Sequence, residues 1–229
     1  QPRILRRRAI NGASFAADRP LLAAPMPKGG YALWSLETGR VLSRMRTDAR
    51  YWPIRLSRDG TRLAGASSGH RAIDVWQIDA GELTRRIAVP TGATALRFSP
   101  DGQRLHVGLV ELNTYRLSDG RRTRHGFGHW RQIYDIQQQH ETNRLITGSR
   151  DNTILLWGQP GQGPARQLGL HENAIVFGDL SGRYDLSPSW DQRASIWDLH
   201  HVSEVITYRG HRAAVTTACF VPGSDWIAS

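Results

Sequence analysis

An internal repeat with a period near 40 residues limits the possible folds of this chain more than any other feature. Aromatic residues return at intervals of 42, 39, 42 and 40 positions, at Trp34, Trp76, Tyr115, Trp157 and Trp197. Turn-forming dipeptides follow a similar period, at Asp59-Gly60, Asp101-Gly102, Thr142-Asn143 and Ser181-Gly182, and Gly223-Ser224 opens a further unit. Two independent markers with one period indicate a chain built from repeated structural units.

The hydrophobic pattern within each unit is that of β-strands. Apolar and polar residues alternate over 95–98 and 104–107, on either side of an Asp-Gly turn, which predicts a hairpin. Further strands are predicted to end at each aromatic residue and to follow the next turn, over 73–78, 154–157, 194–199, 41–45 and 205–208. Four antiparallel strands in a unit of this length are typical of a β-propeller blade.

The repeat therefore predicts an all-β fold, a β-propeller with five four-stranded blades and a partial sixth. The expected blades are 8–46, 47–88, 89–126, 127–169, 170–209 and the partial 210–229, together forming one incomplete domain over 1–229. Closure into a ring removes exposed strand edges, and five blades and a half do not close. We therefore expect the chain to be part of a longer propeller.

Composition narrows the class of protein. Thirty Lys and Arg against twenty Asp and Glu give a net charge of +10, which favours phosphate or acidic partners through long-range attraction. Lys28 is the only lysine, so an arginine bias of the genome explains the excess equally well. Cys219 is the only cysteine, which excludes an internal disulfide framework and a multi-cysteine metal site. The sequence has no apolar stretch long enough for a transmembrane helix.

Three dipeptides carry a resemblance to a known family. Gly128-His129, Trp197-Asp198 and Gly210-His211 stand at positions where the chain resembles the WD-repeat β-propeller family. The resemblance implies a buried hydrogen-bonded tetrad of His, Ser or Thr, Asp and Trp in each blade. It assigns His129, Ser149, Asp151 and Trp157 to one tetrad, and His171, Ser189, Asp191 and Trp197 to the next. Such a set stabilises a blade, because each polar group finds a partner.

Ser149, His129 and Asp151 also match the residue types of a hydrolytic triad. The set recurs from blade to blade, whereas a catalytic triad does not, so we expect no enzyme activity and no cofactor. Surface or tetrad positions account for the scattered histidines better than metal ligation does.

The earlier blades depart from the family pattern. The second has His70 where the turn Asp is expected, and the third has Leu109 there and Tyr115 in place of Trp. We expect these blades to be held together by packing alone. The departure also leaves open the propeller type of prolyl oligopeptidases, although Gly-His and Trp-Asp favour the WD-repeat family.

The resemblance also implies a parent protein, a function and an interaction surface. We expect a bacterial, cytoplasmic, seven-bladed parent and a non-catalytic scaffold that binds a protein or peptide, with an acidic one favoured by the net charge. The rim of one propeller face supplies the candidate partner-binding residues: Tyr51, Trp130, Gln132, Arg150, Glu172, Trp190 and Arg212. Trp, Tyr and Arg dominate interface energetics, although a Trp that folds back on its own blade would be structural.

Two alternatives remain open. In the first, the propeller is the sensor of a larger signalling enzyme with a kinase or nucleotide-binding module. In the second, an arginine-rich surface, with Arg6–Arg8 as one candidate, binds phosphate or nucleic acid. Arg121, Arg122 and Arg124 lie on an expected outer strand, where we expect cations to protect a sheet edge from pairing.

Overall fold

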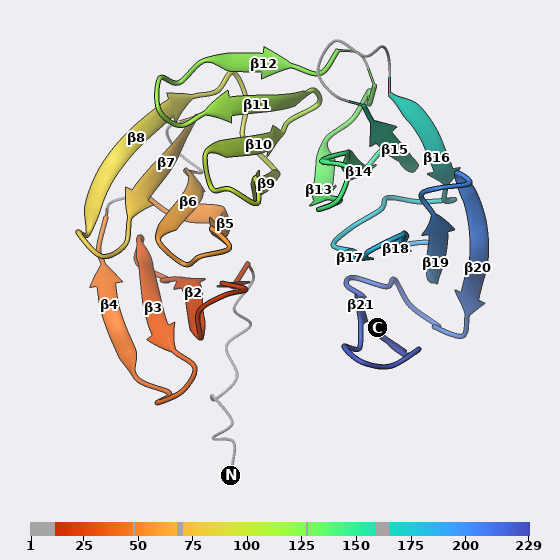
Figure 1. Cartoon of the computed structure of the whole chain (residues 1–229), viewed down its shortest axis with the longest axis horizontal. Helices are drawn as coiled ribbons and strands as arrows, with labels where there is room; N and C mark the ends of the chain where they lie inside the picture. Colours follow the sequence, from red (N-terminus) through yellow and green to blue (C-terminus); the bar gives the residue numbers. More distant parts are fainter. Residues whose placement is uncertain (1–11, 48, 68–70, 127, 159–164) are drawn as a thin grey trace. The chain divides into compact units, whose positions relative to one another are not determined.

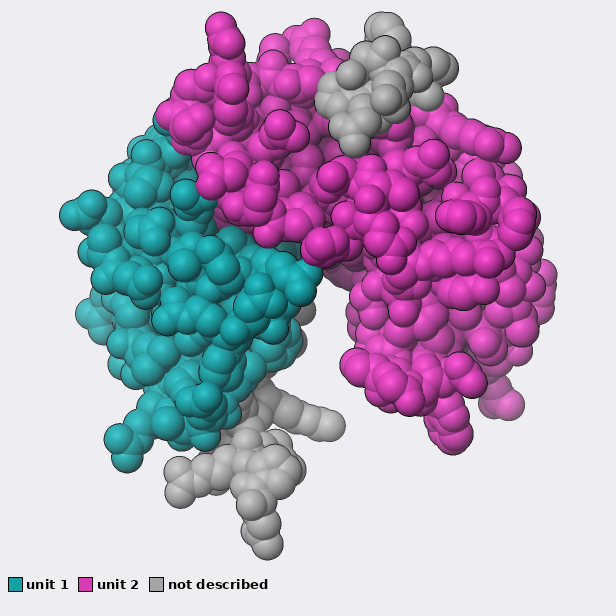
Figure 2. Space-filling model, in the orientation of Figure 1, with its two compact units in different colours: residues 1–92 teal, residues 93–229 magenta. Residues whose placement is uncertain are grey.

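The fold consists of successive antiparallel sheets, each formed by consecutive strands (Figure 1). The computed structural model describes residues 12–47, 49–67, 71–126, 128–158 and 165–229. His70 and Arg6–Arg8 lie outside these residues. The chain divides into two compact units, 1–92 and 93–229, which Figure 2 shows in separate colours.

The first unit contains two four-stranded sheets. The first sheet has β1 (Ser14–Phe15), β2 (Leu21–Pro25), β3 (Tyr31–Ser35) and β4 (Val41–Met45). The second has β5 (Tyr51–Leu56), β6 (Arg62–Ser67), β7 (Ala72–Gln77) and β8 (Glu82–Ala88). Apolar side chains of both sheets, including Leu33, Ile54 and Leu63, form one buried cluster in this unit.

The second unit contains three four-stranded sheets and a two-stranded one. The third sheet has β9 (Ala95–Phe98), β10 (Arg104–Gly108), β11 (Leu112–Arg116) and β12 (Arg122–Arg124). The fourth has β13 (Ile133–Gln138), β14 (Leu145–Ser149), β15 (Thr153–Trp157) and β16 (Arg166–Leu170). The fifth has β17 (Asp179–Ser181), β18 (Tyr184–Pro188), β19 (Arg193–Asp198) and β20 (Ser203–Arg209). The last is the hairpin of β21 (Cys219–Phe220) and β22 (Ile227–Ala228).

These sheets confirm the predicted fold class. Each four-stranded sheet is a simple antiparallel meander, and no helix occurs among the described residues. The four-stranded meander is the blade of a β-propeller. We therefore number the sheets as blades 1 to 5, with the β21–β22 hairpin following them.

The repeated Asp-Gly turns share one arrangement of hydrogen bonds. In blade 3, the Ser99 hydroxyl donates to Asp101 at 2.5 Å and accepts from the Arg104 backbone N–H at 2.9 Å. Gly102 has a φ of +64°, which glycine adopts without a steric penalty. The Ser57, Asp59 and Gly60 turn of blade 2 repeats the arrangement. Side chain and backbone together close the hairpin.

The blade cores are apolar, and the outer strands are exposed. Trp157 packs with Leu155 and Ile136 in one cluster, and Trp197 packs with Ile146 and Ile154 in the next. In contrast, all three residues of β12 are exposed. This placement agrees with the outer position expected for Arg122 and Arg124.

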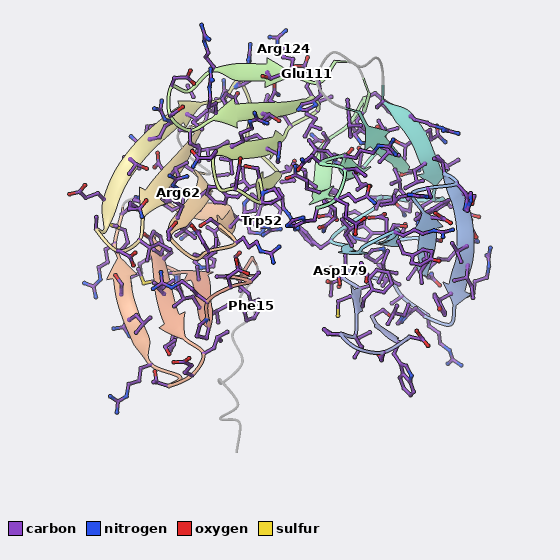
Figure 3. All side chains as sticks on the ribbon, viewed as in Figure 1. Phe15, Trp52, Arg62, Glu111, Arg124 and Asp179 are labelled. Atoms are coloured by element: carbon purple, nitrogen blue, oxygen red, sulfur yellow. The ribbon has the colours of Figure 1, made fainter. Side chains whose placement is uncertain are left out.

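The Arg124 guanidinium lies 4.0 Å from the Glu111 carboxylate, and Figure 3 labels both side chains on blade 3. An edge strand of a sheet that carries charged side chains resists pairing with a foreign strand. The edge-protecting role of Arg121, Arg122 and Arg124 stays a prediction.

Candidate functional site

Blade 4 contains a buried polar network built on four side chains. The His129 imidazole faces Asp151 through Nδ1 at 2.9 Å and Thr147 Oγ1 through Nε2 at 2.7 Å. The Trp157 indole donates to the same Thr147 hydroxyl at 2.8 Å. Nδ1–H therefore donates to the carboxylate, while Nε2 accepts from the Thr147 O–H. Every donor in the network has an acceptor.

Blade 5 repeats this network. His171 Nδ1 lies 2.9 Å from Asp191, and its Nε2 lies 2.9 Å from the Ser187 hydroxyl. The Trp197 indole donates to Ser187 at 2.6 Å. The His, Asp and Trp positions are those expected from the sequence.

The hydroxyl positions expected from the sequence are wrong by two residues. Thr147 and Ser187 occupy them, whereas Ser149 and Ser189 accept the Asp151 and Asp191 backbone N–H groups, each at 3.1 Å. The reason is strand register. Thr147 pairs with Leu155, two residues from Trp157, while Ser149 lies at the turn end of β14. At about 3.3 Å per residue the indole reaches the first hydroxyl and not the second.

This geometry also argues against a hydrolytic triad. A serine nucleophile must be within hydrogen-bond reach of its histidine base. The Ser149 hydroxyl instead donates to the backbone carbonyl of Gln132 at 3.0 Å. Ser149 therefore secures the start of β13, and the His129–Asp151 pair is structural.

The two tetrad carboxylates are strongly held in their ionised form. Burial alone would raise the pKa of Asp151, but hydrogen bonds from His129 and Thr153 bring that pKa well below the ordinary value. Burial likewise opposes ionisation of Asp191, and hydrogen bonds from the Glu172 backbone and His171 lower its pKa.

Each tetrad also fixes one residue of the proposed rim. Asp151 accepts the Trp130 backbone N–H at 3.0 Å, and Asp191 accepts the Glu172 backbone N–H at 3.0 Å. The residue that follows each tetrad His is thus anchored through its main chain. The side chain of that residue is exposed to solvent. The buried tetrad thus positions the backbone of an exposed residue.

Glycine is required beside the tetrad tryptophans. A Cβ on Gly128 would overlap the Trp157 ring, and a Cβ on Gly169 would overlap the Trp197 ring. Neither glycine is at a positive φ, so close approach is the constraint. This contact explains why glycine precedes the tetrad His129.

Blade 2 and blade 3 each contain a polar network of their own, so packing alone does not stabilise either blade, contrary to the sequence expectation. In blade 2, Asp74 is buried, accepts the Tyr51 hydroxyl at 2.7 Å and accepts two guanidinium N–H groups of Arg86, at 2.6 and 2.9 Å. In blade 3, the Thr114 hydroxyl lies 2.7 Å from both His106 Nδ1 and His125 Nε2. Each blade has a polar network with different residues.

Tyr51 is wrongly placed on the partner-binding rim by the sequence. Its side chain is buried, its ring packs edge-on against Trp76 at 4.9 Å, and its hydroxyl is bound to Asp74. Burial, followed by the Asp74 hydrogen bond, raises the pKa of Tyr51 to about 12. An aromatic residue at the start of an inner strand can serve the core or the rim, and the sequence alone did not distinguish these roles.

The other rim candidates lie at the surface of the second unit. Trp130 is 66% exposed, and the Arg131 guanidinium stacks over its ring at 4.6 Å. Trp190 is 41% exposed, with its ring centroid 6.1 Å from that of Tyr134. Neither tryptophan belongs to the buried core.

Polar groups accompany the two tryptophans. Arg150, Glu172 and Arg212 are exposed, and Gln132 is half-buried. Glu172 forms an ion pair of 2.8 Å with Arg193. Arg131, Tyr134 and Arg193 accompany the predicted rim residues and were not predicted from the sequence. In the sequence, only the position of Arg131 next to Trp130 could have indicated that Arg131 belongs to this surface.

Neither a metal site nor a membrane-spanning helix is found in the described part of the chain. No group of three or more His, Cys, Asp or Glu side chains there is arranged to bind a metal ion. A helix long and apolar enough to cross a membrane is likewise absent from the described residues.

Comparison with known proteins gives matches to WD-repeat proteins. The WD40 model, described as WD domain, G-beta repeat, matches residues 120–158 and 202–229. WD repeat-containing protein 18 of Homo sapiens is 24% identical over 193 residues, covering 77% of this chain and 44% of the relative. A guanine nucleotide-binding protein subunit beta of Arabidopsis thaliana is 29% identical over 182 residues, covering 70% and 48%.

A third relative matches a shorter segment. The U3 small nucleolar RNA-associated protein 15 homolog of Gallus gallus is 34% identical over 77 residues, which are 33% of this chain and 15% of the relative. The chain thus spans less than half the length of each of these three relatives. All three come from eukaryotes, so they give no support to the bacterial origin expected from the sequence.

Proposed function

We propose that this chain, whose sheets and matched repeats support its place in the WD40-repeat family, is a non-catalytic scaffold that binds a protein or peptide. The exposed, anchored Trp130 carries the proposal. Its backbone is tied to the buried tetrad and the residue is 66% exposed, so blade 4 presents a large aromatic group from an anchored backbone position. Such preorganised aromatic side chains lose little entropy on binding and are typical interface anchors.

The charge around this ring favours an acidic partner. Arg131 stacks on Trp130, and no described carboxylate forms an ion pair with Arg131, Arg150 or Arg212. The Glu172 carboxylate is offset by Arg193. An acidic peptide with an aromatic or aliphatic anchor therefore matches the chemistry of this surface. Relatives named as subunits of larger proteins agree with a scaffold role.

The test is selection of peptides from a random displayed library with the purified chain as bait. Selected peptides should be enriched in acidic residues. Their affinity should fall at least tenfold in the Trp130→Ala, Trp190→Ala double variant, because an interface anchor contributes about 2 kcal/mol or more. Far-ultraviolet circular dichroism and thermal melting of the variant should match those of the parent.

Trp226→Ala is the matched control, since Trp226 is an exposed tryptophan on the β21–β22 hairpin. Equal loss in this control would show that binding is nonspecific hydrophobic capture. Unchanged affinity in the double variant would remove the rim from the proposal, and unfolding of that variant would show that the two rings are structural.

A further inference from the structure

A polar cleft of about 250 Å³ lies in the second unit, between blades 3 and 4. Its blade 3 wall includes Arg104, His106, Thr114 and His125, and its blade 4 wall includes Gln138 and Asn143 among others. A water molecule occupies about 30 Å³ in the liquid, so the cleft has room for roughly eight waters or a ligand of similar size. None of the rim residues lines it.

The two cleft histidines belong to one directed hydrogen-bond chain. His106 Nε2 lies 3.2 Å from Gln138 Oε1, so this nitrogen donates and Nδ1 accepts from the Thr114 hydroxyl. The Thr114 oxygen then accepts from His125 Nε2–H. These hydrogen bonds hold the side chains of the cleft wall in place, and the Gln138 carbonyl oxygen is already an acceptor in them. The Gln138 amide N–H groups have no hydrogen-bond partner among the described residues.

The remaining donors of the cleft are also unused. Arg104 has no ion pair and Asn143 has no side-chain hydrogen bond within the described part of the chain. Asn143 is held in the left-handed region with a φ of +55°, which fixes its backbone at the edge of the cleft. Three side chains therefore offer N–H groups to this space: the guanidinium of Arg104 and the amides of Asn143 and Gln138.

The cleft contains one carboxylate, that of Asp101, whose pKa is lowered first by the Ser99 hydrogen bond and also by the charge of Arg104. Asp101 accepts the Ser99 hydroxyl at 2.5 Å and the Gln103 backbone N–H at 3.0 Å. Positively charged side chains also lie near His106 in this wall. The pKa of His106 is lowered to about 3, first by burial and then by His125 and the charges of Arg97 and Arg104, against a hydrogen bond to Gln138 that raises it. Spare N–H donors beside the Arg104 guanidinium match an anion.

We propose that the cleft between blades 3 and 4 binds an oxyanion, a carboxylate or phosphate group, with Arg104 as its charged ligand and Asn143 and Gln138 as amide donors. The cleft volume admits a small di- or tricarboxylate, a phosphate ester, or one acidic side chain of a peptide. The chemistry of recognition is the same for these sources. The site is separate from the rim and does not depend on the proposed scaffold function.

The experiment is an NMR titration of the isotopically labelled whole chain in a buffer without oxyanions. Citrate, inorganic phosphate and a short peptide containing one phosphoserine are the three probes. We expect at least one probe to give saturable shifts, below about 1 mM, in the side-chain signals of His106, His125 and Gln138. Binding of the peptide alone would place the oxyanion on a polypeptide, and binding of citrate or phosphate would show that a free anion suffices.

Two variants test the ligand assignment. Arg104→Ala should weaken the binding at least tenfold. Asn143→Gly should weaken it about threefold, because glycine keeps the left-handed backbone and removes the amide. Arg122→Ala is the control, since Arg122 is an exposed arginine on the outer strand of the same blade and does not line the cleft.

The proposal fails if Arg122→Ala weakens binding as much as Arg104→Ala, which would indicate general charge attraction. It also fails if no probe gives a saturable shift in the cleft. Arg104 is exposed, so its substitution leaves the core intact, and the parent-like dispersion of the remaining amide signals verifies this.

Discussion

The Thr147 hydroxyl joins an imidazole to an indole and is the smallest unit on which blade 4 depends. It accepts from Trp157 and donates to His129, and all three side chains are buried. Thr147→Val keeps the shape and removes both hydrogen bonds. We expect a loss of about 2–4 kcal/mol of unfolding free energy, because two buried polar groups lose their partner. Urea unfolding followed by tryptophan fluorescence measures it.

Two further variants separate the role of this hydroxyl from general packing. Thr147→Ser should restore the stability and the exchange protection of the Trp157 indole proton. Ser149→Ala should leave that proton protected, because Ser149 bonds to backbone groups of the β13 and turn segments. If Ser149→Ala exposes the indole proton and Thr147→Val does not, the register argument is wrong.

At this scale the sequence predicts residue types better than it predicts roles. His129, Asp151 and Trp157 could be found because each stands at a turn or strand end with a fixed spacing. The hydroxyl could not, because Thr147 and Ser149 point to the same face of β14 and only the pairing with β15 decides between them. The prediction for Tyr51 was wrong for a related reason, because its buried partner Asp74 lies on a strand two elements away.

Blade 2 illustrates how an element replaces a missing tetrad. Asp74 on β7 is nearly inaccessible to solvent, and Arg86 on the neighbouring outer strand β8 covers it with a two-pronged contact. The Tyr51 hydroxyl on β5 completes the set. Three strands of one sheet are thus linked by a single carboxylate, which does for blade 2 what the His129 network does for blade 4.

Arg86→Leu should therefore destabilise the first unit by about 2–3 kcal/mol, since it leaves a buried carboxylate with one partner fewer. Adding Asp74→Asn should recover most of the loss, because a neutral amide tolerates burial better than an unpaired charge. Chemical denaturation of both variants and of Arg85→Leu, the adjacent position on β8, measures this coupling. Equal losses in the single and double variants would show that the ion pair adds nothing.

Strand periodicity could be predicted in every blade, and the polar networks of blades 2 and 3 could not. Alternation and turn dipeptides are local, so they survive in a single sequence. Asp74 with Arg86, and His106 with His125, are matched across strands, and no spacing rule marks them. Without the expected turn Asp, these blades look unsupported in sequence although they are not.

The pH dependence of stability is a property of the whole second unit, because buried groups of opposite sign contribute to it. His106 is folded with a pKa of about 3 against an ordinary value near 6.5, chiefly because of burial. Between those values the unfolded chain binds the proton and the folded chain does not. Stability therefore rises with pH across this window, by at most about 1.4 kcal/mol per pH unit for one group.

Asp185 on β18 acts in the opposite direction. Burial, and then the charges of Asp135 and Asp179, raise its pKa well above the ordinary value. Above about pH 4 the folded chain holds a proton that the unfolded chain has released. Its contribution therefore decreases as pH rises. Asp151 and Asp191 have lowered pKa values, so their stabilising contribution is fully present above about pH 4 and is lost as pH falls below it.

The two opposing groups can be separated by measuring the unfolding free energy between about pH 4.5 and 6.5, where His106 makes stability rise with pH and Asp185 makes it fall. Asp185→Asn should steepen the rise with pH and add stability at pH 6.5, because it removes the cost of a buried acid. His106→Gln should flatten the rise, since the group that charges on unfolding is gone. His140→Gln, at an exposed position after β13, is the control and should follow the parent curve. Parallel curves for His106→Gln and the parent would mean that burial of His106 does not set the acid sensitivity of this unit.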